Sequence, residues 1–193
     1  MAQFKAFNAG VEVNGETVLS IVAGMGIFKE NALQILSENG ISNPQPGMWY
    51  SQQAWLNAFK TIAEKIGETT LYQIGRKIPE NAQWPPDVNT IEKGLASIDV
   101  AYHMNHRLNN EVLYNPATGL MREGIGHYGF AKAGDRAVKM TCNNPYPCAF
   151  DLGIIDAVAD KFAGKGELPK SKHEDPKTCR KTGADACIYT VAW

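Results

Sequence analysis

All four cysteines of this 193-residue chain lie in about its last quarter, where they form two local pairs. Cys142 and Cys148 flank the segment Asn-Asn-Pro-Tyr-Pro, and seven residues separate Cys179 from Cys187. Such a grouping has three interpretations: ligation of a metal ion, inert packing of buried thiols, or disulfide bonds. The choice constrains the fold, because a metal ion or a disulfide ties distant segments to each other.

The redox environment argues against disulfides. The first residues, Met1 to Asn8, lack the basic head and apolar run of a secretory signal, so we expect a cytoplasmic and reducing location. Zinc is the expected metal, since it accepts tetrahedral sulfur and nitrogen ligands without redox chemistry. Neither pair has the Cys-x2-Cys spacing of a zinc knuckle, so metal ligation and inert packing both stay open.

Charge and hydropathy exclude two classes of partner. The net charge is −1, from 19 basic and 20 acidic residues, which gives no basic surface for a nucleic acid. The longest apolar stretch, Val18 to Ile27, is interrupted by Ser20, Gly24 and Gly26 and is shorter than the ~20 residues that a membrane span needs. We therefore expect neither a nucleic-acid partner nor a membrane span.

Hydrophobic spacing predicts a helical first half. Val11 and Val13 indicate a short strand before the turn Asn14-Gly15, and Leu19 to Leu36 is expected to be mainly helical. The clearest helix is predicted from Trp49 onward, and a further turn or two follows through Leu71 and Ile74. The residues that share one helix face are Trp55, Phe59, Ile62 and Ile66, and then Ile91, Leu95, Ile98 and Tyr102 in a helix opened by Asp87.

The second half changes to a strand period. Three short strands, Glu111 to Tyr114, Gly126 to Lys132 and Arg136 to Thr141, are predicted as an antiparallel meander. A helix begins just after Pro147, and Cys187 to Trp193 alternates as a final strand. The sequence thus predicts one α+β domain over residues 1–193, with a helical N-terminal half followed by an antiparallel sheet and a packed helix.

The C-terminal segment resembles the 4-vinyl-reductase domain family. The matching residues are Asn144-Pro145-Tyr146-Pro147-Cys148 with Gly153, and then the run from Cys179 to Cys187, which leads into the strand Ile188-Tyr189. That family shares its fold with small TRAPP vesicle-tethering subunits and with haem nitric-oxide-binding domains. The resemblance implies a small-molecule sensor or carrier, with a hydrophobic cavity between helices and sheet and a cysteine-bound zinc ion nearby.

The resemblance also suggests the metal ligands. Three of them map onto Cys148, Cys179 and Cys187. Zinc-binding members commonly have a carboxylate three residues before the first cysteine of the last pair, where this chain has Pro176. Cys142 is the first choice for the fourth ligand, and the alternatives are His173, Glu174 and Asp175.

Aromatic and histidine residues suggest the cavity wall. Its predicted members are Trp55, Phe59, Tyr102, His127, Tyr128 and Phe130. His103 and His106 are interpreted as caps of a helix end, and a metal or haem ligand is the alternative. The carboxylates Asp151, Asp156 and Asp160 are interpreted as structural residues on the solvent face of a helix.

The leading hypothesis is therefore a module that binds or senses an apolar or aromatic small molecule and carries a structural zinc ion. A closed four-ligand site has no open position for chemistry, so a role other than catalysis is favoured. Two alternatives remain: an enzyme or accessory subunit that acts on a tetrapyrrole-like substrate, with haem or another tetrapyrrole bound, and a TRAPP-like protein-binding scaffold. The expected partners are a second copy of the chain, in a homodimer, and a separate signalling protein.

Overall fold

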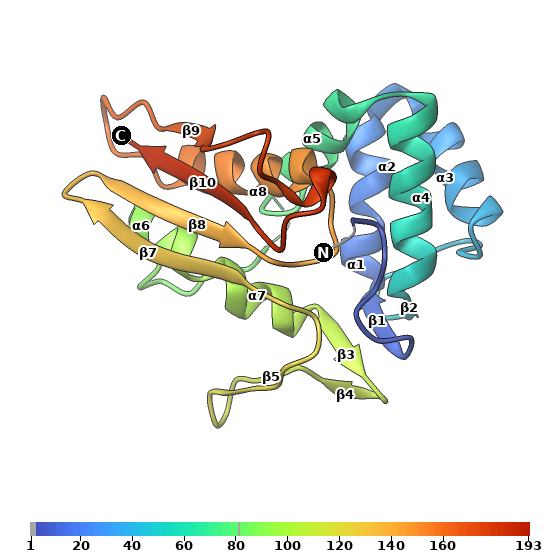
Figure 1. The fold of residues 1–193 in the computed structure, drawn as a ribbon. Coiled ribbons are helices and arrows are strands. Elements are labelled where there is room, and N and C mark those ends of the chain that lie inside the picture. The colour runs from blue at the N-terminus through green and yellow to red at the C-terminus, as the bar shows by residue number, and fades with distance from the viewer. Residues whose placement is uncertain (1–2, 81) are drawn as a thin grey trace.

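The computed structural model describes residues 3–80 and 82–193 and has an α+β fold. Its helical elements are α1 (Gly15–Val18), α2 (Ser20–Met25), η1 (Gly26–Phe28), α3 (Lys29–Glu38), α4 (Gln52–Lys65), α5 (Glu68–Lys77), α6 (Ile91–Ala96), α7 (Ile98–Met104), α8 (Cys148–Lys161) and η2 (Arg180–Thr182). Its strands are β1 (Val11–Asn14), β2 (Trp49–Ser51), β3 (His106–Leu108), β4 (Glu111–Val112), β5 (Tyr114–Asn115), β6 (Leu120–Met121), β7 (Tyr128–Gly134), β8 (Ala137–Cys142), β9 (Lys170–His173) and β10 (Cys187–Ala192). Helices α1 to α4 gather at one end of the molecule, and the sheet that contains β7 to β10 lies at the other end (Figure 1).

Helix α4 begins three residues later than the sequence predicts. Trp49 belongs to β2, which pairs with β1 through the register position Asn14–Trp49. The Ser51 side chain then accepts a hydrogen bond from the Ala54 N–H and caps the helix. The strand pairing therefore takes Trp49 from the helix, while Trp55, Phe59 and Ile62 of the predicted face are buried as expected.

The first helical run is divided into short pieces. By length and composition alone, Gly15–Glu38 is long and apolar enough to cross a membrane. The chain breaks it into α1, α2, η1 and α3, and Val18, Ile21 and Leu36 are buried in the core. Core helices of globular proteins pass the same length and composition test, so this run is weak evidence for a span.

Close contacts between glycines allow the central helices to pack. A Cβ atom on Gly75 of α5 would lie 2.1 Å from the Phe150 carbonyl oxygen, and one on Gly153 of α8 would lie 2.2 Å from the Tyr72 carbonyl oxygen. Because no side chain fits at these distances, glycine is required at both positions. Helix α5 is a full helix of 10 residues, where the sequence indicated only a turn or two.

The main sheet has the strand order β7-β8-β10-β9 and is antiparallel throughout. Helices α6, α7 and α8 lie on one face of it (Figure 1). Alternate residues of β8 and β10 are buried, as expected for a sheet with one covered face. Cys142 of β8 is paired in register with Cys187 of β10.

Two predictions about the strands and the helix before them need correction, and one strand was missed. Glu111 to Tyr114 does not join the meander, because β4 pairs with β3 in the β2-β1-β3-β4 sheet and β5 pairs with β6. The helix expected from Asp87 is two helices, α6 and α7, and Thr90 rather than Asp87 caps the first. Strand β9 was not predicted, because its sequence Lys-Ser-Lys-His has almost no apolar content and lies at a sheet edge.

Candidate functional site

Three cysteines and one histidine meet where α8 approaches β9 and β10. Cys148 begins α8, His173 ends β9, Cys187 begins β10, and Cys179 directly precedes η2. Each of the four offers one potential ligand atom, and these atoms all lie within 4.8 Å of one another. The start of α8 therefore meets three positions between residues 173 and 187 in one group of donors, which we call the Cys3His cluster.

The donors of the Cys3His cluster have the chemistry of a tetrahedral metal site. The Sγ atoms of Cys148 and Cys187 are 3.1 Å apart. This distance is somewhat shorter than the separation of about 3.8 Å between two sulfur ligands of a tetrahedral zinc ion with Zn–S bonds of ~2.3 Å. The His173 Nε2 atom is buried and has no hydrogen-bond partner. A buried polar atom without a partner costs roughly 1–3 kcal/mol, and a bound cation would supply the missing partner.

The alternatives for the fourth ligand lie elsewhere. Cys142 is buried next to the Cys3His cluster but does not belong to it. Glu174 accepts a hydrogen bond from Thr190 and pairs with Lys139, and Asp175 accepts a hydrogen bond from the Lys177 N–H. Of the four candidates, the structure brings only His173 together with the three cysteines.

The surroundings of Cys187 favour a thiolate. Its Sγ atom accepts a hydrogen bond from Cys148, and the main-chain N–H and the Nε of Arg180 each lie 3.4 Å from it. The Cys148 hydrogen bond and the Arg180 donors lower the pKa of Cys187, against the raising effect of burial. The Cys148 pKa is raised by the same hydrogen bond and by burial. Of the two sulfurs, these contacts therefore favour Cys187 as the one that loses its proton.

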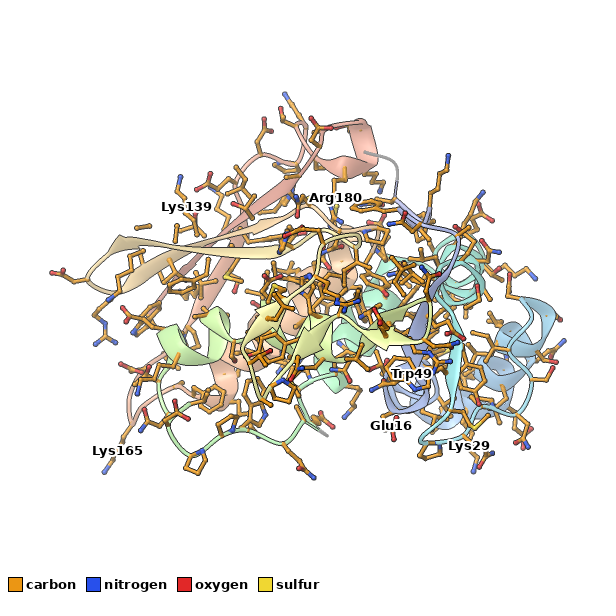
Figure 2. All side chains as sticks on the ribbon, turned by 90° about the horizontal axis from the view of Figure 1, so that it is seen from below. Glu16, Lys29, Trp49, Lys139, Lys165 and Arg180 are labelled. Carbon is orange, nitrogen blue, oxygen red and sulfur yellow. The ribbon has the colours of Figure 1, made fainter. Side chains whose placement is uncertain are left out.

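Arg180 extends from the Cys3His cluster into the core. Its side chain is fully buried, and it lies within the body of the molecule, whereas Lys165 projects from the edge (Figure 2). The guanidinium donates hydrogen bonds to the Asp151 carboxylate and to the main-chain and side-chain carbonyl oxygens of Asn144. The Tyr128 hydroxyl donates to the other Asp151 oxygen at 2.5 Å.

Asp151 corrects a prediction from the sequence. It does not lie on the solvent face of α8, because it is 0% exposed and its pair with Arg180 is entirely buried. Burial raises the pKa of Asp151 to about 6, although Arg180 opposes this. Asp156 and Asp160 do lie at the surface side, where they contact Tyr72 and Arg76. The lone signal for a buried role was the position of Asp151 in the first turn, among apolar neighbours.

A cavity of about 130 Å³ lies between the N-terminal helices and the sheet side of the molecule. Its wall is mostly aromatic, and it includes two buried polar atoms without hydrogen-bond partners, Ser20 Oγ and Trp55 Nε1. A benzene-sized molecule fits a cavity of about 150 Å³, so the space suits one small ring or a similar compact group. The aromatic wall residues are Trp55, Trp84, Tyr102, His106, Tyr128, Tyr146 and Phe150.

The predicted wall residues fall into two groups. Trp55, Tyr102 and Tyr128 line the cavity. Phe59 is buried behind it and packs on Trp55, with ring centroids 4.7 Å apart. Phe130 packs partly buried against the core, and His127 contacts Asp99 and Glu123 away from the cavity.

His106 belongs to the cavity wall, which its predicted position at a helix end did not suggest. It is the first residue of β3, and its Nδ1 lies 2.7 Å from the Tyr102 carbonyl oxygen. Because a carbonyl only accepts, Nδ1 carries the proton, and Nε2 accepts a 2.6 Å hydrogen bond from the Tyr146 hydroxyl. Gln52 in turn donates to the Tyr146 oxygen at 2.9 Å. His106, which follows α7, therefore caps a carbonyl of the last helical turn, as expected, and also contributes to the cavity wall.

No family model matches the chain, and no curated protein matches its sequence. Solved H-NOX structures share its fold. A mutant H-NOX from T. tengcongensis is 15% identical with a TM-score of 0.62, and the match covers 93% of this chain and 96% of that one. An H-NOX protein from S. oneidensis in the Fe(II)NO ligation state is 11% identical with a TM-score of 0.62, covering 92% and 97%. An oxygen-binding H-NOX domain related to soluble guanylate cyclases is 14% identical with a TM-score of 0.60, covering 93% and 94%. The fold expected from the sequence, that of the haem nitric-oxide-binding domains, is confirmed.

Proposed function

We propose that this chain is a sensory or carrier domain that holds a compact aromatic or apolar molecule in its cavity and a structural zinc ion in the Cys3His cluster. The observation that carries the proposal is the buried, unpartnered Nε2 of His173 beside three cysteine sulfurs. The same cysteines carry the resemblance to the 4-vinyl-reductase domain family, which supports the assignment. A homodimer and a separate signalling partner are part of this proposal.

Zinc fits the donor set better than other common ions. Three sulfurs and one imidazole nitrogen form a Cys3His set, which is a frequent structural zinc site, whereas calcium and magnesium require oxygen ligands. Zinc bound there would link the start of α8, the end of β9 and the start of β10. With four protein ligands the ion has no open position, so its role would be structural.

The cavity supports a ligand that is small and carries a polar group. Apolar and aromatic side chains form most of its wall, while Ser20 Oγ and Trp55 Nε1 offer unused hydrogen-bonding atoms. A single ring with one polar substituent would satisfy both features. A ligand without polar atoms would leave Ser20 and Trp55 unpaired.

A buried polar chain supports communication between the two sites. Tyr128 lines the cavity and donates to Asp151, Asp151 accepts from Arg180, and Arg180 contacts Cys187. A ligand that moves the Tyr128 hydroxyl would alter the partners of a carboxylate with no access to water. This arrangement favours a sensor over a passive carrier.

Haem is the alternative that the H-NOX neighbours suggest, and the residues present here do not fit it. Cofactor pockets commonly have ~300–1,000 Å³, and this cavity has about 130 Å³. Among the described residues that line it, His106 is the only histidine, and both of its ring nitrogens are hydrogen bonded. Lys77 is the only cationic side chain in the described part of the wall, so it alone could pair with the two carboxylates of a haem. We therefore derive no step through haem.

Native mass spectrometry of protein purified without a chelator tests the proposal. We expect about one zinc ion per chain and a bound small molecule whose mass matches a single-ring compound. Denatured protein treated with a chelator but no reductant should contain four alkylatable thiols. Protein with less than about a tenth of an equivalent of zinc contradicts the metal assignment, and a stoichiometric tetrapyrrole contradicts the ligand assignment.

A further inference from the structure

A second group of potential ligands comes from α7 and the residue before β7, elements that contribute nothing to the Cys3His cluster. Asp99 is in the first turn of α7, His103 is in its last turn, and His127 directly precedes β7. One potential ligand atom from each lies within 4.8 Å of those of the other two. Residues four apart on a helix share one face, which explains how Asp99 and His103 meet.

His103 has one ring nitrogen with a partner and one without. Its Nδ1 donates to the main-chain carbonyl oxygen of Asp99 at 2.8 Å, because a carbonyl only accepts. The side chain is 0% exposed, and Nε2 has no hydrogen-bond partner. Metal-binding histidines usually donate their other N–H to a carbonyl or carboxylate in this way.

His127 links two carboxylates next to that ring. Its Nδ1 is 2.9 Å from Asp99 Oδ2, and its Nε2 is 2.9 Å from Glu123 Oε2. The rings of His103 and His127 lie 5.1 Å apart between centroids. Asp99 also accepts a hydrogen bond from the Tyr128 N–H, which fixes the orientation of its carboxylate.

We propose that Asp99, His103 and His127 form a site for a divalent transition-metal ion that is separate from the Cys3His cluster, with Glu123 as an outer partner that holds the His127 ring through Nε2. Two imidazoles with a carboxylate suit zinc, cobalt, nickel or iron, whereas calcium and magnesium favour oxygen donors alone. On binding, the cation takes the place of the proton between His127 and Asp99, and that proton leaves to solvent.

The site is accessible from solvent and can complete its coordination. The Asp99, His127 and Glu123 side chains are 21%, 31% and 80% exposed, so a hydrated ion reaches them while His103 stays buried. The two carboxylates attract a dication. Three protein ligands leave the ion an open position for a water molecule.

Cobalt(II) is a suitable probe, because a thiolate site and a nitrogen–oxygen site differ in their spectra. We dialyse the full chain, as isolated with its zinc, against cobalt(II) and measure bound cobalt together with the visible spectrum. We expect one cobalt per chain with ligand-field bands and no added thiolate-to-cobalt charge-transfer band. Binding that appears only with the charge-transfer band, or no binding, overturns the proposal. Cobalt at the Cys3His cluster adds the charge-transfer band to the ligand-field bands, so a failure of the zinc assignment there is seen separately.

Two exposed variants and one control locate the ion. His127→Gln should weaken cobalt binding by at least about 100-fold and Glu123→Gln by about tenfold, since removal of even an outer partner costs 10–100-fold. Asp160→Asn removes a half-exposed carboxylate on α8, which pairs with Arg76, and should bind cobalt like the parent. Equal affinity of the parent and His127→Gln contradicts the site. Circular dichroism of each variant establishes that it is folded.

Discussion

The Sγ atoms of Cys148 and Cys187 lie 3.1 Å apart, although the residues are 39 positions apart in the chain. Cys148 begins α8 and Cys187 begins β10, and the rest of α8, residues 162–169, β9 and η2 lie between them in the chain. Any ion held by both sulfurs closes this long loop. Because such a site exists only in the folded chain, its binding free energy adds to the free energy of unfolding.

Cys148→Ser and Cys187→Ser should each remove the metal and lower the melting temperature together. A loss of several kcal/mol in the free energy of unfolding, on the order of a zinc site's contribution, corresponds to a decrease of about 10 °C or more in the melting temperature of a chain of this length. Elemental analysis and a thermal melt with and without chelator measure both effects. A variant that loses zinc but melts like the parent would show that the ion has no structural role.

His173→Ala and Cys142→Ala distinguish the two leading candidates for the fourth ligand. Because His173 belongs to the Cys3His cluster and Cys142 does not, we expect the first variant to bind zinc at least about tenfold more weakly and the second to retain full occupancy. Competition with a chromophoric chelator gives the affinities. The reverse order would restore Cys142 as the ligand.

Ala101→Leu should fill the cavity. Ala101 lies in the wall on α7, and three additional carbon atoms occupy most of a space that suits one ring. Binding of indole, followed by fluorescence or calorimetry, should decrease at least about tenfold, while the free energy of unfolding changes by less than about 1.5 kcal/mol. Ala96→Leu, the same substitution at an exposed position of α6, should leave indole binding unchanged. Equal binding by parent and Ala101→Leu places the ligand elsewhere.

The sequence predicted the elements whose apolar residues recur regularly. Helix α8 and strand β10 appear where the spacing placed them, because burial of one face determines both period and position. The candidate ligand His173 was only one of four alternatives, since the strand that carries it is polar and its position depends on pairing with β10. The pairing of Arg180 with Asp151 across 29 positions had no local signal, because a buried ion pair depends on tertiary contacts alone.

Gly153→Ala should destabilise the fold by at least about 2 kcal/mol. The new Cβ atom would lie 2.2 Å from the Tyr72 carbonyl oxygen, so α5 and α8 would have to move apart. Gly129→Ala on β7 is the matched control, because its Cβ meets the nearest atom at 3.4 Å, an ordinary contact. Urea unfolding gives both free energies. Similar stability of the two variants would mean that the helices adjust to a wider spacing at little cost.

His106→Gln should make the protein less sensitive to acid. Burial lowers the pKa of His106 to about 3, against ~6.5 in an unfolded chain, so between these values the unfolded state binds one more proton than the folded state. The free energy of unfolding therefore falls as the pH decreases from about 6.5 toward 3, by up to about 1.4 kcal/mol per pH unit from this residue. Glutamine does not titrate, yet it can accept from Tyr146 and donate to the Tyr102 carbonyl, so the fold should persist at a cost of about 1–3 kcal/mol at neutral pH.

Urea unfolding at about pH 7.5, 6, 5 and 4 gives the free energy of unfolding of the parent and of the His106→Gln variant as a function of pH. We expect a shallower slope against pH for the variant, because all other titrating groups contribute equally to both proteins. Parallel slopes would show that His106 is protonated in the folded protein and that the Tyr146–His106 hydrogen bond has the opposite direction.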